Sequence, residues 1–367
     1  MRIEEMNPYD KFIISCKSEA TKKEYTAALN RFMSQYEIKE YEDILKLSVK
    51  ELEGIVIDYT LSLKKRDLSK GYVTQALAAI KRFLFMNDVV LNWNKIMQYK
   101  GEFTKKQNKG YSHEQIEKLL QICDIRTRAV VLIFCSVGIR AGALPELRIK
   151  SLKRFEDSYQ FNIYEGFNEQ YISFCTPECA VAIDNYLSFR KRQGEILNDQ
   201  SYLIRTEFDI NDLEQIRMES NPVATSTIRS ILWRYMVKSG IREVSHDKHQ
   251  MKNIPEIHGF RKFYSTQLVN AELNTEKRWM LEGHNLKGND NSYVKPTVQD
   301  LYDEYSKAIN LLTINPENRL KKRVQELEVD ADYLISMMKR VEDLENMTKG
   351  LVTKVREGKK SGRIIVR

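Results

Sequence analysis

The sequence predicts a mainly α-helical protein with one small β-hairpin (an α+β fold), and three observations lead to this class. Apolar residues recur at three- and four-residue steps through much of residues 10–99, the spacing of amphipathic helices. Two short stretches, 159–164 and 171–175, alternate as the strands of a hairpin do. From Leu320 onward the apolar residues instead keep a seven-residue repeat, which is typical of a coiled coil.

Length and composition allow two domains and favour a polyanionic partner. The chain has 367 residues, 42% of them hydrophobic, which is enough for a sizeable core. Lysine and arginine number 59 against 51 acidic residues, giving a net charge of +8. No apolar run approaches the ~18 residues that span a membrane, and the polar first ten residues lack a signal-peptide pattern. The five scattered cysteines indicate reduced thiols in a cytoplasmic protein.

Residues 258–293 hold the densest set of chemically active side chains. His258 and Arg261 form a His-x-x-Arg motif, which is followed by Gly283-His284 and then by Tyr293. A phenol can form a covalent ester with phosphorus, an arginine fork matches two phosphate oxygens, and histidines transfer protons near neutral pH. Each residue alone has an ordinary structural explanation. Their order and spacing together predict phosphate chemistry at a tyrosine.

This order resembles the tyrosine recombinase (phage-type integrase) family, which shows an arginine box, His-x-x-Arg, Gly-His and then a tyrosine. The ending Ser292-Tyr293-x-x-Pro296 looks like the archaeal branch, and the resemblance spans most of residues 10–312. Together with the residue patterns it gives, in chain order, a helical core-binding (SAM-like) DNA-binding domain at 1–99, a basic linker at 100–110 and a catalytic domain at 111–314. The heptad repeat beyond the resemblance adds a C-terminal coiled-coil helix with a basic tail at 315–367.

Arg140 directly follows the strongly apolar helix expected at 126–137 and its Gly138 stop. An arginine so close to a buried helix needs an anion nearby, and from this segment alone an internal salt bridge is the plainer explanation. The resemblance assigns Arg140 instead as the first catalytic arginine. With Arg261 it is expected to clamp the phosphate and stabilise the charge of the transition state.

The resemblance implies that Tyr293 attacks the scissile phosphate, that His258 transfers a proton and that His284 hydrogen-bonds the phosphate. Tyr302 and Tyr305, on the next expected helix, are rival nucleophiles, although their distance from His284 fits the family less well.

The sequence departs from the family pattern in two places. Ala143 stands where many members have a glutamate, and Glu146 is a candidate for that supporting role. The turn 165–170 of the expected hairpin carries no lysine, whereas the family places its general-acid lysine there. Lys248, Lys252, a histidine or a water molecule remain open for that task.

Neither a metal nor another cofactor is expected. Cys175 and Cys179 lack a second pair or a nearby histidine to complete a four-ligand site, so they are interpreted as core thiols. His246 and His249 have no evident third ligand. The reaction implied by the resemblance keeps the bond energy in a phosphotyrosyl link, so it runs without ATP or a metal.

DNA contact is expected mainly from the N-terminal domain and the linker, where each basic residue alone equally suits a solvated surface. Such contacts position a duplex through its phosphates and read little sequence. The candidates are Lys22, Lys23, Lys64, Lys65, Arg66, Lys70, Lys81, Arg82, Lys105 and Lys106. A further basic cluster at 190–192 suits the C-terminus of its helix or a phosphate.

The tail carries a heptad core, which continues with a register slip after residue 341. Its members are Leu320, Val324, Leu327, Ala331, Leu334, Met338 and Val341. We interpret it as a coiled coil that joins protomers. A single helix folded back on the catalytic domain is the alternative.

The resemblance implies a site-specific recombinase of a mobile element. It would cut and rejoin duplex DNA through a 3′-phosphotyrosyl intermediate as a dimer or tetramer, in the cytoplasm of a prokaryotic or archaeal cell. A type IB topoisomerase uses the same chemistry without paired sites. An inactive DNA-binding relative would keep the fold, and the missing hairpin lysine leaves this open. A structural coiled-coil protein would explain only the tail.

Overall fold

The computed structural model describes residues 5–66, 68–101, 108–218, 220–243, 254–284 and 295–360. Within the last helix, the side chains of residues 322, 323, 325, 326, 329 and 353–360 are not described. The chain divides into two compact units, Met1–Lys106 and Gln107–Arg367. No helix in the described ranges is long and apolar enough to cross a membrane.

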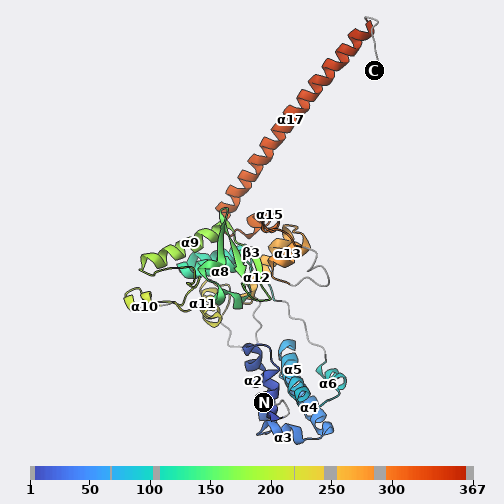
Figure 1. Cartoon of the computed structure of the whole chain (residues 1–367), viewed down its shortest axis with the longest axis vertical. Helices are drawn as coiled ribbons and strands as arrows, with labels where there is room; N and C mark the ends of the chain where they lie inside the picture. The colour runs from blue at the N-terminus through green and yellow to red at the C-terminus, as the bar shows by residue number, and fades with distance from the viewer. Residues whose placement is uncertain are drawn as a thin grey trace. The chain divides into compact units, whose positions relative to one another are not determined.

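The first unit is a helical bundle (Figure 1). Serine side chains cap several of its helices: Ser18, Ser48 and Ser69 each accept a hydrogen bond from a backbone N–H of the first turn. Helix α5 packs against α1, α2 and α4, and α6 packs against α4. The helices are α1 (Pro8–Ile14), α2 (Glu19–Gln35), α3 (Tyr41–Lys46), α4 (Val49–Lys65), α5 (Lys70–Met86) and α6 (Trp93–Lys100).

The second unit is built around helix α8 (Ile125–Ser136), whose residues from Ala129 onward are all buried. Helices α9 and α12 both pack against α8 (Figure 1). Its other helices are α7 (His113–Ile122), η2 (Ala141–Glu146, a 3-10 helix), η3 (Ile149–Ser151, also 3-10), α9 (Pro177–Arg192), α10 (Leu213–Arg217), α11 (Thr225–Lys238), α12 (His258–Asn270), α13 (Thr275–Leu281), α15 (Val298–Ser306), α16 (Ile309–Leu312) and α17 (Pro316–Lys360).

A three-stranded antiparallel sheet of order β1-β2-β3 belongs to the second unit. Strands β2 (Ser158–Ile163) and β3 (Tyr171–Phe174) form the hairpin expected from the sequence, with Ile163 opposite Tyr171. Strand β1 (Leu152–Phe155) adds to β2 and has little alternation of its own. A mainly helical fold with one small sheet is therefore confirmed.

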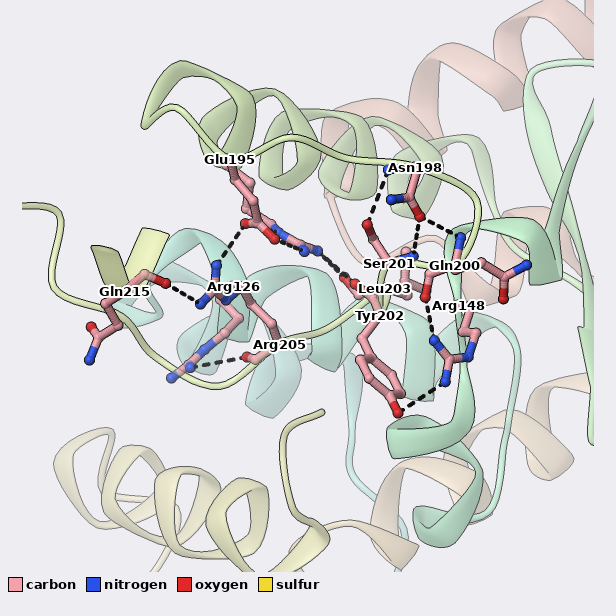
Figure 2. Close-up of polar contacts among 11 residues, drawn as sticks. Arg126, Arg148, Glu195, Asn198, Gln200, Ser201, Tyr202, Leu203, Arg205 and Gln215 are labelled. Atoms are coloured by element: carbon pink, nitrogen blue, oxygen red, sulfur yellow. Dashed lines mark hydrogen bonds and ion pairs between the residues drawn. The ribbon is translucent and has the colours of Figure 1, made fainter. Parts of the chain in front are cut away.

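A buried ionic network holds the segment that follows α9. The Arg190 side chain is fully buried and donates to both oxygens of the Glu195 carboxylate, at 2.8 and 2.5 Å. Arg205 Nη1 lies 3.1 Å from the same carboxylate, and Figure 2 shows the two groups facing each other. Arg190 also donates to the backbone carbonyls of Tyr202 and Leu203. Arg190 lies in the last turn of α9, as the helix-end interpretation of the 190–192 cluster expects, and the Glu195 carboxylate neutralises it inside the unit.

Helix α17 exposes its apolar seam in the single chain. The exposed fractions are 67% for Leu320, 61% for Leu334, 71% for Met338 and 53% for Val341. The described part of the chain therefore leaves this seam uncovered.

Candidate active site

A tight turn places Arg140 at the end of the buried helix α8. Gly138 adopts a left-handed φ of +66°, and a Cβ there would lie 2.0 Å from the Tyr264 ring. Only glycine allows the chain to turn this close to α12. Arg140 follows, and its Nη2 donates to the Gly283 carbonyl at 2.9 Å while the side chain stays exposed. The guanidinium is thus fixed at one edge and open to solvent at the other.

Helix α12 carries His258 and Arg261 one turn apart, on one face of the helix. Arg261 is only 7% exposed. Its guanidinium donates to the Gly138 carbonyl and to the Glu282 carbonyl. It thereby links the Arg140 turn to the turn that carries His284.

The Gly283-His284 turn follows α13 and closes against the hairpin. Gly283 has a φ of +64°, and a Cβ there would meet the Tyr171 ring at 2.5 Å. The His284 N–H returns to the Trp279 carbonyl at 2.9 Å, which ends the helix in the usual left-handed cap. These contacts fix where the imidazole leaves the backbone.

The two ring nitrogens of His284 have different partners. Nδ1 lies 3.0 Å from the Glu282 carboxylate, and Nε2 lies 3.1 Å from Arg261 Nη2. A guanidinium can only donate, so Nε2 accepts from Arg261 and Nδ1–H donates to Glu282. Burial lowers the pKa of His284 and the charges of Arg261 and Arg140 lower it further, although Glu282 opposes them. The free protein therefore holds a neutral imidazole at pH 7.

His258 has similar electrostatics. Burial lowers its pKa, and the neighbouring charges of Lys262 and Arg261 act in the same direction. A neutral imidazole can accept a proton, which is the protonation state a general base needs.

Two buried polar atoms beside Arg261 have no hydrogen-bond partner among the described residues: the Tyr171 hydroxyl and Glu282 Oε1. Buried polar groups are normally satisfied. Two arginines and an oriented imidazole gathered in this way form a suitable site for a tetrahedral oxyanion such as phosphate.

The structure brings Arg140, Arg261 and His284 together, with His258 one turn away. Tyr293 lies outside the described residues, as do Lys248, Lys252, His246 and His249.

The rival tyrosines point into the core. The Tyr305 hydroxyl donates to the Ser136 carbonyl at 2.9 Å, and the Tyr302 ring packs on Phe174. Glu146 is exposed and forms no ion pair with a described residue. No contact among the described residues therefore supports the role toward Arg140 that was considered for Glu146.

The basic residues of the first unit differ in their surroundings. Lys23, Lys64, Lys65, Arg66 and Lys70 are exposed. The other three described candidates have partners within the unit, as follows: Lys22 pairs with Glu19 at 2.6 Å, Lys81 lies over the Trp93 ring, and Arg82 donates to Ser15. Lys105 and Lys106 lie outside the described residues.

Sequence reasoning did not single out Glu282, Tyr171 or Tyr164, all of which lie around the arginines. Glu282 precedes the Gly-His pair directly, and an acidic residue there was the available signal for a carboxylate that orients the histidine. The tyrosines gave no signal beyond the strand pattern.

Comparisons with known proteins identify solved structures of similar fold. No protein-family model and no curated protein matches the sequence. Among solved structures, the Tn1549 transposon integrase in complex with circular intermediate DNA is 14% identical, covers 82% of this chain and 99% of its own, and has a TM-score of 0.55. A variant of that integrase with transposon right end DNA has the same identity and coverage and a TM-score of 0.51. A XerA recombinase structure is 19% identical, covers 83% of this chain and 98% of its own, and has a TM-score of 0.38. The similarity to the integrase confirms the tyrosine recombinase fold that the sequence predicts.

Proposed function

We propose that this protein is a site-specific tyrosine recombinase that cleaves and rejoins duplex DNA through a 3′-phosphotyrosyl intermediate. The observation that carries this proposal is the convergence of Arg140, Arg261 and His284 from three separate elements. In the proposed reaction Tyr293 attacks the phosphorus atom, while Arg140 and Arg261 stabilise the charge on the non-bridging oxygens. His258 accepts the tyrosine proton, and His284 reaches the same phosphate.

The proposed substrate also fits the charge of the chain. The net charge is +8, and the exposed cations of the first unit include neighbours such as Lys64, Lys65 and Arg66. Phosphate contacts of this kind supply affinity without reading sequence. We place the protein with the DNA of a prokaryotic or archaeal cell, as part of a mobile element.

Strand cleavage is tested with a suicide duplex, nicked so that the 5′ fragment diffuses away after attack. We expect the protein to become covalently attached to the DNA, and Tyr293→Phe to abolish this product because it removes the nucleophilic oxygen. A denaturing gel with end-labelled DNA measures the adduct. Tyr302→Phe is the matched control and should keep the adduct.

A covalent adduct that persists in Tyr293→Phe would show that another residue is the nucleophile. Dependence on two sites then separates the candidate reactions. A recombinase needs paired sites, whereas relaxation of a supercoiled plasmid without any paired site would indicate a topoisomerase.

We also propose that α17 joins two protomers of this chain as a coiled coil. Its exposed seam keeps heptad spacing from Leu320 to Val341, which matches the repeat that a second helix of the same kind can cover. Dimers formed in this way would bring two catalytic units to paired DNA sites.

Leu334→Glu is expected to convert the dimer to a monomer, because it places a charge in the centre of the seam. Sedimentation equilibrium measures the mass. Ser336→Glu introduces the same charge on the opposite face of α17 and should leave the dimer intact. A wild-type chain that is monomeric across the concentration range would contradict the coiled-coil proposal.

A further inference from the structure

Tyr164, directly after β2, has a strained backbone beside the two arginines. Its φ is +55°, in the left-handed region that bulky aromatic residues rarely occupy. Such a conformation is strained and persists when surrounding contacts hold it. Here the Tyr164 carbonyl accepts the Phe167 N–H at 3.0 Å, which anchors the hairpin turn. Glycine or asparagine would fit this backbone with less strain. The presence of a tyrosine at this position therefore indicates a role for its side chain.

The strained turn directs the phenol toward the Arg140 side of the site. A Cβ at Gly142, two residues beyond Arg140, would lie 3.9 Å from the Tyr164 hydroxyl. The ring packs against the core of the unit and is half-buried. The hydroxyl forms no hydrogen bond to any other described residue, so it is free to meet a ligand at the arginines.

The charges around Tyr164 come from several elements. Burial is the main influence and raises the pKa of the phenol. Arg140 and Arg261 lower that pKa, while Glu146 and Glu169 raise it. The net effect keeps the proton on the oxygen at neutral pH. The two guanidiniums can also stabilise the phenolate once the proton has left.

We propose that Tyr164 is the acid that protonates the departing 5′ oxygen during strand cleavage, an inference that rests on the proposed recombinase function. The Tyr293 oxygen forms a bond to phosphorus, the bond from phosphorus to the 5′ oxygen breaks, and that oxygen takes the Tyr164 proton. The Tyr293 proton passes to His258. In rejoining, the Tyr164 phenolate takes the proton back from the attacking 5′ hydroxyl.

The position of Tyr164 agrees with the absence of a lysine from this turn. Residues 165–170 offer only Glu165, Gly166, Phe167, Asn168, Glu169 and Gln170. None of these side chains is a proton donor at neutral pH suited to an alkoxide leaving group. Tyr171, at the other end of the turn, has a buried hydroxyl, so the half-buried phenol of Tyr164 is the acid that the hairpin can present to a ligand.

The test compares two suicide substrates, one ordinary and one with sulfur in place of the bridging 5′ oxygen. A thiolate leaves without protonation because thiol pKa values lie near 8.5. Tyr164→Phe is expected to cleave the oxygen substrate about 10²–10⁴-fold more slowly than the wild type and the sulfur substrate at close to the wild-type rate. Tyr159→Phe on β2 is the matched control, since its hydroxyl donates to Asp184 instead. This control should cleave both substrates normally.

Equal slowing on both substrates would mean that Tyr164 only positions the site, and an unchanged rate on the oxygen substrate would remove it from the reaction. Either result overturns the inference while the wild type still forms its covalent adduct. If the wild type forms no adduct with either substrate, the proposed function itself fails.

Discussion

Arg261→Ala is expected to slow strand cleavage by about 10³-fold or more, because it removes a preorganised charge from the transition state. Arg261 is nearly buried, and two backbone carbonyls and His284 orient its guanidinium. Arg261→Lys should recover only part of the rate, since an ammonium keeps the charge and loses the planar fork. Single-turnover cleavage of the suicide duplex measures the rate.

The control for Arg261→Ala is Arg154→Ala. Arg154 lies on β1, is half-exposed, and pairs with Asp184 at 3.1 Å rather than with the site residues. It should cleave at the wild-type rate. A folded Arg261→Ala protein that also cleaves at that rate would contradict the assignment of this arginine to the phosphate. Circular dichroism shows whether the variant is folded.

The sequence predicted the helical class, the hairpin and the arrangement that gathers Arg261 and His284, because these features depend on local periodicity and on a spaced motif. Arg140 was assigned to the site only through the family resemblance, because its place after a buried helix is explained equally by an internal salt bridge. The role of Glu282 could not be predicted from the sequence, because it depends on the His284 ring lying beside the carboxylate in the folded protein.

The features that the sequence did not predict depend on partners that only folding supplies. The sequence placed Arg190 at a helix end but did not predict that Glu195 neutralises it inside the unit. The sequence of strand β1 shows little alternation of buried and exposed residues, and the strand forms by pairing with β2. The left-handed backbone of Tyr164 has no sequence signature, because glycine and asparagine mark such turns and tyrosine does not.

Glu195→Gln is expected to destabilise the second unit by about 3–5 kcal/mol, because it leaves the charges of Arg190 and Arg205 buried without a counter-charge. Arg190 is 0% and Arg205 3% exposed. For a unit of this size the change should lower the melting temperature by roughly 10 °C. Differential scanning calorimetry resolves it, and the transition of the first unit serves as an internal reference.

Asp184→Asn is the matched control. Asp184 pairs with Arg154 at 3.1 Å, and the two side chains are 44% and 54% exposed, so the loss of this charge should cost less than about 1 kcal/mol. Equal melting temperatures for Glu195→Gln and the wild type would show that the buried carboxylate contributes nothing.

The contribution of Glu195 should also depend on pH. Burial alone would raise the pKa of this carboxyl, but hydrogen bonds and charges from Arg190 and Arg205 outweigh burial and lower it. The stabilisation is therefore complete above the unfolded-state pKa of about 4.3 and is lost as the pH falls through the lower folded-state value. The wild type and Glu195→Gln should accordingly converge in stability below that pH, and a difference that stays constant into acid would contradict the ionic account.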